Sequence, residues 1–266
     1  MNLDKLLDTG DNMELVEKDK LRTRKFDSYW GNELQNVFND IAENYDEAND
    51  FFSFGMWNHI RHRFIKNIVL SDNDEVLDVC AGTNAVSIDL LTKNDSIMVT
   101  AFDRSKAMQK IGSARAAEKG YKIKSVIGDA HKLPFMDNEF DIVTLEAATR
   151  HLVVNDVFKE IRRVLKPGGF FYHCDLVKPS NRVVAFIYYN YLRVMMPVTT
   201  LLFFRSKEFL GFRNRALQLA KYFIEAIDVF YTAEELSMLM EDNGFKNIDT
   251  KKLFLGTVAF HQAQLL

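Results

Sequence analysis

The stretch VLDVCAGTN at residues 76–84 constrains the fold of this 266-residue chain more than any other. Val76, Leu77 and Val79 form a short apolar run of the kind that becomes a strand buried in a parallel sheet. Small residues follow, where the backbone can approach a ligand closely, and a helical apolar pattern comes next. In an open α/β sheet, a strand, a tight turn and a helix in this order mark the place where a nucleotide-like cofactor binds. Asn84 is unusual, because such turns commonly have another glycine there.

Apolar runs and amphipathic stretches alternate along most of the chain. This alternation predicts an α/β fold with a doubly wound, Rossmann-like sheet of seven mostly parallel strands and helices on both faces. We also expect an antiparallel last strand and a helical cap on the N-terminal side. The predicted strands are residues 76–79, 97–102, 123–127, 142–145, 170–174, 246–254 and 257–261.

Local signals set the boundaries of several predicted helices. Residues 37–45 have helical spacing, and turn formers and aromatics at residues 49–55 are expected to end that helix. The amphipathic pattern at residues 156–166 is expected to stop at the Pro-Gly-Gly that follows it. Thr232 and Glu235 have the spacing of a capping box at the start of a further helix.

Domain organisation and composition narrow the functional classes. We expect residues 1–35 to be a polar extension and residues 36–266 to form one domain with a helical insertion at about residues 180–230. The chain has 34 Lys plus Arg against 37 Asp plus Glu, so no excess of positive charge indicates a nucleic-acid partner. Cys80 and Cys174 are too few for a disulfide framework or a metal cluster, and the N-terminal residues lack the pattern of a signal peptide. These features favour a cytoplasmic protein without a metal.

Acidic residues follow two of the predicted strands. Asp103 ends the second strand, where a carboxylate can accept hydrogen bonds from both ribose hydroxyls of a nucleoside. Asp129 and Ala130, after the third strand, could lie beside an adenine. Either aspartate could instead be an ordinary helix or turn cap. The turn contains one glycine, Gly82, whereas a pyrophosphate-binding turn is rich in glycine, so S-adenosylmethionine fits better than a dinucleotide.

Further motifs make the comparison with known families specific. The first set is VLDVCAGT at residues 76–83, Asp103, GDAHKLPF at 128–135, FD at 140–141 and RVLKPGG at 163–169. With these the chain resembles the class I S-adenosylmethionine-dependent methyltransferases. The second set is VFNDIAENYD at 37–46, ND at 49–50, SFG at 53–55, YFIEAI at 222–227 and GTVAFH at 256–261. With these it resembles the ubiquinone/menaquinone C-methyltransferases, over about residues 36–262.

The resemblance implies roles for individual residues. Asp78 matches the acidic residue that orients the turn and the amino-acid end of the cofactor, and Asn84 belongs to the same turn. Glu146 stands at a cofactor-site position where the family usually has a small residue. The remaining positions that contact the cofactor are matched by Gly82, Thr83, Asp103, Asp129 and Ala130.

The catalytic candidates follow from the chemistry that the resemblance implies. Methylation of a quinol ring carbon is helped by removal of a proton from a ring hydroxyl, and a histidine near neutral pKa suits that work. His151, which replaces a family asparagine, is the first candidate base, and Arg150 matches a family arginine near the substrate that could stabilise a phenolate. Tyr45 and Asp46 are the next candidates. His151 could instead cap the following helix or pair with Glu146.

The apolar segment at residues 183–204 is long enough to span a bilayer, but Arg193 and Pro197 in its middle argue against that. One interpretation is a pair of buried helices covering the sheet edge. Another is a mobile apolar lid that lines a tunnel for a prenyl tail and touches a membrane surface. The basic residues that could meet anionic headgroups there are Arg182, Arg193, Arg205 and Lys207.

Three functional hypotheses compete. The leading one is an S-adenosylmethionine-dependent C-methyltransferase that acts on a prenylated quinol. The second keeps the cofactor and changes the acceptor to another apolar small molecule. The third is a non-catalytic paralogue that binds the cofactor as part of a lipid- or quinone-synthesising complex. The sequence leaves the oligomeric state open, a homodimer included.

Overall fold

The fold is described from a computed structural model, which places residues 14–28, 34–203 and 220–266. Seven strands form one sheet in the order β3-β2-β1-β4-β5-β7-β6. Strand β7 runs antiparallel to both of its neighbours, and the other pairings are parallel. The predicted sheet with an antiparallel last strand is therefore confirmed. The strands are β1 (Glu75–Val79), β2 (Met98–Asp103), β3 (Lys124–Ile127), β4 (Phe140–Glu146), β5 (Leu165–Leu176), β6 (Lys246–Leu253) and β7 (Val258–Gln264).

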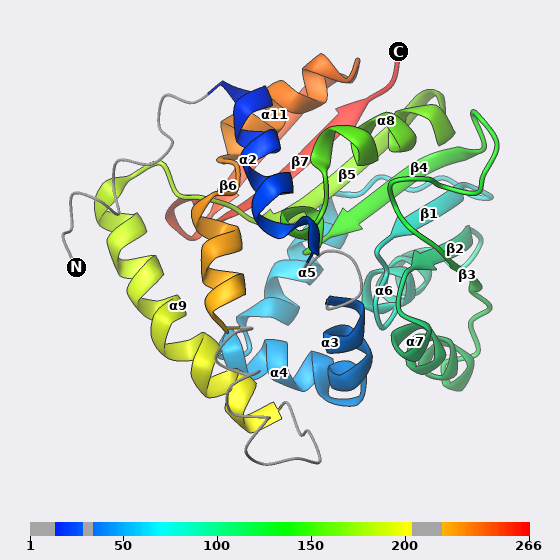
Figure 1. Cartoon of the computed structure of the whole chain (residues 1–266). Helices are drawn as coiled ribbons and strands as arrows, with labels where there is room; N and C mark the ends of the chain where they lie inside the picture. The colour runs from blue at the N-terminus through cyan, green and yellow to red at the C-terminus, as the bar shows by residue number, and fades with distance from the viewer. Residues whose placement is uncertain (1–13, 29–33, 204–219) are drawn as a thin grey trace.

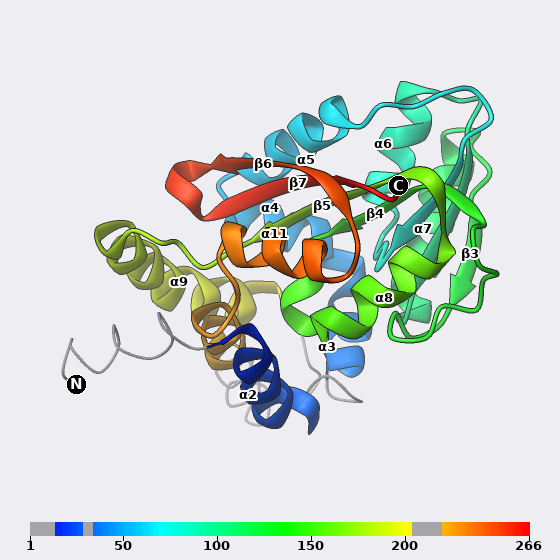
Figure 2. The same ribbon diagram turned by 90° about the horizontal axis from the view of Figure 1, so that it is seen from above.

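Helices cover both faces of the sheet (Figures 1 and 2). α5 (Met56–Asn67) and α6 (Ala85–Lys93) pack on one face, and α8 (Val154–Val164) and α11 (Ala233–Asp242) pack on the other. Side chains of β1 alternate between the two cores, as a strand requires. The other helices are α2 (Leu15–Ser28), α3 (Leu34–Ile41), α4 (Tyr45–Phe52), α7 (Lys106–Glu118) and α9 (Arg182–Phe203), with a helical stretch at 220–228 and short 3₁₀ turns η2 (Ala42–Asn44), η3 (Thr149–His151) and η4 (Phe254–Gly256).

Local capping signals behave as predicted at the start of α11. The Thr232 hydroxyl accepts the Glu235 N–H at 3.2 Å, and the Glu235 carboxylate accepts the Thr232 N–H at 2.7 Å. This reciprocal pair satisfies two N–H groups that the first turn of a helix leaves without a partner.

Two predicted helix boundaries are wrong. The helix of residues 37–45 is divided at η2, and α4 then runs through the predicted turn as far as Phe52, because Ala48 is buried and Phe52 packs on Tyr191 of α9. At the other boundary, α8 ends at Val164, before the Pro-Gly-Gly. The chain passes directly into β5 there, because Leu165 already pairs with Phe140 of β4.

The predicted pair of helices at residues 183–204 is also wrong, because α9 is one continuous helix with Pro197 inside it. One side of α9 is buried and includes Ala185, Leu192 and Thr200. The other side is apolar but exposed, with Ile187 63% accessible. Among the described residues, no helix is both long and apolar enough to cross a membrane.

Helix α2 packs against the domain although the sequence predicts a polar extension there. Lys18, Arg22 and Phe26 are almost completely buried. In Figure 1, α2 lies in front of the sheet beside α8 and α11. The division at residue 35 stays a prediction.

Candidate active site

The turn between β1 and α6 has an unusual backbone. Cys80, Gly82 and Asn84 all have positive φ angles, between 53° and 59°. The turn is tied to β2, because the Ala81 N–H donates to the Phe102 carbonyl at 3.1 Å and the Gly82 N–H donates to the Asp103 carboxylate at 2.8 Å. Glycine removes the strain of the left-handed conformation at position 82. The predicted tight turn is thus fixed by the end of the neighbouring strand.

Asp78 lies beneath this turn. Its carboxylate accepts hydrogen bonds from the Ser87 hydroxyl at 2.6 Å and the Thr144 hydroxyl at 2.8 Å. Burial raises the pKa of Asp78 to about 6, and the two hydroxyl hydrogen bonds oppose that shift. Asp78 therefore joins β1 to α6 and β4 and holds the turn in place from below.

The side chain of Asn84 points toward α7. Its Oδ1 accepts the amide of Gln109 at 2.7 Å, and its Cγ occupies the space that a Cβ at position 112 would need, at 2.6 Å. Asn84 is completely buried and adopts the left-handed conformation that asparagine tolerates better than most residues. The turn accepts an asparagine because α7 has Gly112 opposite it.

The acidic residues at the strand ends lie in different surroundings. Asp103 is buried and accepts N–H groups from Gly82 at 2.8 Å and Ser105 at 2.7 Å; burial nevertheless raises its pKa. Asp129 is half-exposed, and its carboxylate contacts His131 Nδ1 at 2.5 Å. Ala130 is buried in the core. Asp103 lines one of the three cavities described next, whereas Asp129 and Ala130 are not among the described lining residues of any of them.

Three adjoining cavities meet at Tyr45 and Ala147, which line all of them. The strand-end cavity is lined by Gly82, Asp103, Ser105, Met108, Glu146 and His151, among others. The turn cavity lies beside the β1–α6 turn and is lined by Asp46, Arg61, Asp78, Thr83 and Glu146, among others. The apolar cavity lies under the helical cap and α9 and is lined by Phe38, Ile41, Phe52, Trp57, Arg150 and Met196, among others. Most of the predicted site residues are thus brought together around one junction.

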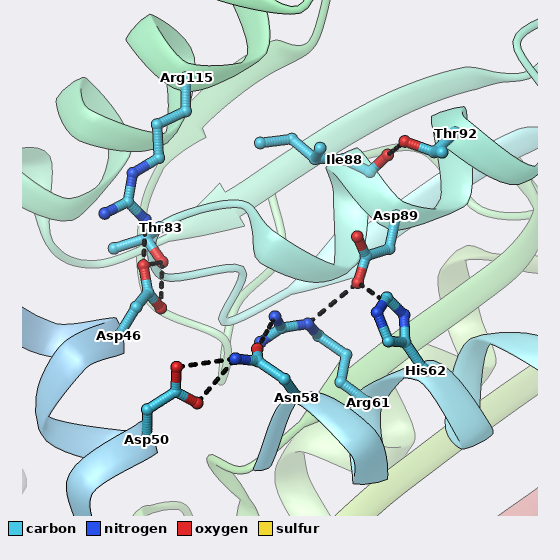
Figure 3. Close-up of polar contacts among 10 residues, drawn as sticks. All are labelled: Asp46, Asp50, Asn58, Arg61, His62, Thr83, Ile88, Asp89, Thr92 and Arg115. Atoms are coloured by element: carbon cyan, nitrogen blue, oxygen red, sulfur yellow. Dashed lines mark hydrogen bonds and ion pairs between the residues drawn. The ribbon is translucent and has the colours of Figure 1, made fainter. Parts of the chain in front are cut away.

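Polar contacts join the helical cap to the turn (Figure 3). The Asp46 carboxylate on α4 accepts the Thr83 hydroxyl at 3.1 Å and also pairs with Arg115 of α7. On α5, Arg61 donates to Asp89 of α6 at 3.0 Å. Asp46, a predicted catalytic candidate, is therefore occupied in holding α4 over the turn.

Glu146 ends β4 at the boundary between the strand-end and turn cavities. Its Oε1 is shielded from solvent and has no hydrogen-bond partner among the described residues. Burial raises the pKa of the Glu146 carboxyl to about 8, and the positive charge of Arg61 opposes the shift. The carboxyl is therefore mostly protonated at neutral pH and becomes charged just above it.

Arg150 is held by a buried ion pair. Its Nη1 donates to Asp175 Oδ1 at 2.5 Å, and both side chains are buried. The Asp175 carboxylate also accepts the N–H groups of Thr149 and Leu176. Arg150 is the one charged side chain among the described residues that line the apolar cavity. A fixed positive charge at an apolar wall is suited to a ligand with a developing negative charge.

His151 is buried against three aromatic rings, those of Phe38, Tyr222 and Phe223. Its Nδ1 lies 2.6 Å from the Tyr222 hydroxyl, and its Nε2 has no hydrogen-bond partner among the described residues. Burial, together with the charges of Arg150 and Arg22, lowers the pKa of His151 well below its usual value, so the ring is neutral. The near-neutral pKa that the sequence led us to expect of His151 is therefore wrong. The two alternatives from the sequence are not observed: Val153 is the N-cap residue of α8, and Tyr222 is the partner of His151.

Comparison with known proteins decides the family. The model of the ubiE/COQ5 methyltransferase family matches residues 26–264. The chain belongs to this family. A demethylmenaquinone methyltransferase of Symbiobacterium thermophilum is 32% identical over 86% of this chain and 90% of its own length. The corresponding Staphylococcus carnosus protein is 34% identical over 86% and 91%.

Solved structures support the same fold. A SAM-dependent methyltransferase of Thermotoga maritima has a TM-score of 0.57 at 16% identity, over 87% of this chain and 99% of its own. One from Aquifex aeolicus has a TM-score of 0.53 at 16% identity, over 77% and 89%. The protein is an S-adenosylmethionine-dependent methyltransferase of the ubiE/COQ5 family.

The site of this methyltransferase suits its cofactor. The β1–α6 turn offers a close backbone approach at Gly82, and the carboxylate of Asp103 stands beside it. Glu146 Oε1 is a buried polar atom without a hydrogen-bond partner in the described part of the chain, and Glu146 lines both polar cavities. A ligand with a polar nucleoside, a central positive charge and an amino-acid end matches this donor and acceptor set.

Sequence reasoning missed Asp175, Tyr222, Gln109 and Gly112 as parts of the site. Each acts on a residue that the sequence did indicate, namely Arg150, His151 or Asn84. Two of them had a usable signal: Gly112, because a glycine inside a predicted helix can mark close packing, and Tyr222, which begins the YFIEAI stretch that contributes to the family resemblance.

Proposed function

We propose that this methyltransferase methylates a ring carbon of a prenylated quinol of the ubiquinone or menaquinone type. The observation that supports this most directly is the apolar cavity, which meets the two polar cavities at Tyr45 and Ala147. Its aromatic and aliphatic walls suit a ring and a prenyl tail, and Arg150 can balance the charge of a ring oxygen. The printed name of the relatives, demethylmenaquinone methyltransferase, points to the same class of acceptor.

Four residues would form the centre of the cofactor site. Asp103 would accept hydrogen bonds from the ribose hydroxyls. Gly82 and Thr83 would lie along the amino-acid part, and Asp78 would hold the turn under them. The bound cofactor supplies an electrophilic methyl group.

The other predicted cofactor residues would act around this centre. Glu146, once ionised, would attract the sulfonium charge across a short, water-poor gap. Asn84 would shape the turn from behind, because its side chain faces α7. Asp129 and Ala130 would border the adenine side.

His151 is the proposed base. When its Nδ1–H donates to the Tyr222 hydroxyl, Nε2 has a lone pair that can take the proton of a ring hydroxyl. The resulting phenolate raises the electron density on the adjacent ring carbon, and Arg150 would stabilise its charge. Burial raises the pKa of Tyr45, so its hydroxyl stays protonated and can donate a hydrogen bond. Asp46 would position α4 over the turn.

Methyl transfer to defined acceptors tests this proposal. The purified protein is incubated with S-adenosylmethionine carrying a labelled methyl group and with reduced, short-chain demethylated naphthoquinol or benzoquinol. We expect label on a ring carbon of one of these quinols, located by mass fragmentation. A lipid extract is tested in parallel. If label appears only on another apolar compound of that extract, the proposed quinol acceptor is wrong. Failure to bind S-adenosylhomocysteine would contradict the assignment of the cofactor site.

We also propose peripheral contact between α9 and a bilayer that contains anionic lipids. The exposed side of α9 has a stripe of large apolar residues, and α4 and the turn after it add two phenylalanines beside it. α9 contains Arg182 and Arg193 and no acidic residue, which fits an anionic surface. The other two predicted basic residues, Arg205 and Lys207, lie outside the described residues. The apolar residues are Phe51, Phe54, Val183, Phe186, Ile187, Val194, Val198, Leu201 and Leu202.

Continuity with the apolar cavity argues for a lipid surface as the occupant. Met196, Thr199 and Thr200 of the same helix line that cavity, so α9 separates a site for a lipid-soluble acceptor from the exposed stripe. In a flotation assay we expect the protein to bind phosphatidylglycerol vesicles but not phosphatidylcholine vesicles. The variant Phe186→Ser/Ile187→Ser should not bind either kind of vesicle. A stripe that instead joins two copies of the chain would show as a dimer that this variant dissociates, and it would overturn the lipid proposal.

A further inference from the structure

Helix α2 lies almost wholly outside the family match, which begins at residue 26. It nevertheless packs beside η3, the 3₁₀ turn that holds Arg150 and His151. Figures 1 and 2 show α2 alongside α8, with η3 just before the start of that helix in the chain. The residues of α2 before position 26 therefore lie outside the matched family domain.

Arg22 makes the contact between α2 and the active-site turn. Its side chain is completely buried, and its Nη2 donates to the carbonyls of Arg150 and Leu152, each at 3.2 Å. The guanidinium lies over the rings of Phe230 and Tyr231, at 5.0 and 4.9 Å from their centroids. The planar fork of an arginine can bridge two carbonyls while stacking on aromatic faces, which a lysine cannot do equally well.

Two other residues of α2 fix the helix to the domain without touching η3. Lys18 pairs with Glu235 of α11 at 2.6 Å, with the Lys18 side chain almost fully buried. Asp19 accepts the Tyr231 hydroxyl at 3.0 Å and the Asn155 amide at 3.2 Å. Helix α2 is therefore held in position by α11, Tyr231 and α8. The side chain of Arg22 extends from α2 to η3.

We propose that α2 is a positioning element of the active site, in which Arg22 fixes the backbone of η3 and thereby the orientations of Arg150 and His151. One rigid, charged group binds the carbonyls on both sides of His151. The backbone of the turn therefore has little freedom to move, and this fixes the directions in which the side chains of Arg150 and His151 leave it. Hydrogen bonds to a charged donor are stronger than neutral ones. A displacement of about 1 Å at a catalytic group can lower a rate about 100-fold.

The inference rests on the proposed function only in its kinetic part, so the test has two readouts. The full-length variants Arg22→Met, Arg22→Lys and Lys18→Met are compared with the parent chain. The first readout is methyl transfer to the quinol, divided into kcat and KM. The second is the titration of labelled histidine by NMR, which needs neither acceptor nor cofactor.

We expect Arg22→Met to lower kcat by about 10- to 100-fold. It should also raise the pKa of His151, because burial, the charge of Arg150 and the charge of Arg22 together hold that pKa down, and the variant removes the last of these. Arg22→Lys should recover part of kcat, because a lysine keeps the charge and can reach one carbonyl. Lys18→Met, which removes a contact of the same helix, should lower thermal stability and leave kcat within about 2-fold, since Lys18 does not contact η3.

Three outcomes would overturn the inference. The first is that Arg22→Met and Lys18→Met have equal kcat values. The second is that the His151 titration does not change in Arg22→Met. The third is that Arg22→Lys has the kcat of the parent chain and an unchanged His151 titration. If Arg22→Met does not fold, Arg22→Lys decides by its kcat, which should lie below that of the parent chain because a lysine can reach only one of the two carbonyls. If the parent chain is inactive on every quinol and Arg22→Met still shifts the His151 titration, the quinol proposal is contradicted and the positioning role stays supported.

Discussion

The cofactor side and the acceptor side of the site are built in different ways. The β1–α6 turn, the end of β2 and the facing part of α7 lie close together in sequence, and hydrogen bonds of the Ala81 and Gly82 N–H groups hold them. The acceptor side combines α3, α4, η3, α9 and the helical stretch at 220–228, which come from distant parts of the chain. The first side can be inferred from a short motif. The acceptor side depends on which segments pack together, so the same fold and cofactor site can serve different acceptors.

The largest effect should come from the acceptor side. In Arg150→Met/Asp175→Asn, the second change avoids a buried carboxylate without a cation. We expect methyl transfer to fall by about 100- to 1,000-fold, because the charge that would balance the phenolate is lost. Affinity for S-adenosylhomocysteine, measured by calorimetry, should change by less than about 3-fold. An equal loss of both would mean that Arg150 belongs to the cofactor side.

On the cofactor side, Asp103→Ala should weaken S-adenosylhomocysteine binding by about 100-fold. The variant removes the acceptor of the Gly82 and Ser105 N–H groups and of the ribose hydroxyls, and each charge-assisted hydrogen bond contributes about 1.5–3 kcal/mol. Asp249→Ala is the matched control, since Asp249 is exposed on β6 and outside the described lining of the three cavities. Equal losses in the two variants, by the same calorimetry, would contradict the assignment.

The predictions from sequence succeeded where neighbours in sequence decide the structure. The strand, turn and helix at residues 75–93 and the capping box at Thr232 follow from local patterns and are observed. Other features could not be predicted from local patterns. The end of α4 depends on a contact with α9, and the end of α8 depends on the pairing of Leu165 with Phe140. The continuity of α9 depends on the burial of one of its sides.

The same reason limits prediction of the site. His151 and Tyr222 are separated by 71 residues, and Arg22 and Leu152 by 130. A motif gives the type of residue at a position but not the partner that fixes its tautomer or orientation. Asn84 illustrates the point, because it departs from the motif and its compensation lies in another helix, at Gly112.

The Asn84–Gly112 contact should be visible in stability. Gly112→Ala places a Cβ 2.6 Å from Asn84 Cγ, and we expect it to lower the free energy of unfolding by about 1–3 kcal/mol, as overpacking does. Asn84→Gly alone should leave the fold unchanged and alter cofactor affinity modestly. Combined with Gly112→Ala it should restore most of the loss in urea unfolding. If the double variant is as unstable as Gly112→Ala, the clash is not the cause.

The smallest effect should be a pH dependence at Glu146. Its pKa of about 8 is raised by burial, so the carboxyl gains its charge as the pH rises through that value. Groups whose charges act on it are Arg61, Asp78, Asp89 and Asp175. The affinity ratio of S-adenosylmethionine to S-adenosylhomocysteine should rise by up to about 10-fold between about pH 7 and pH 9, because only the first ligand has a sulfonium. Both ligands share the same amino group, so its titration cancels in the ratio. A ratio that rises equally in Glu146→Gln would point to another group.

The central claim is that the methyl group passes between the two sides where Tyr45 and Ala147 line all three cavities. Single-turnover transfer of labelled methyl to the quinol, in the parent chain and in Ala147→Leu, tests it most directly. We predict transfer in the parent chain and a loss of about 100-fold in Ala147→Leu, with S-adenosylhomocysteine still bound. Undiminished transfer through the filled junction would contradict the account.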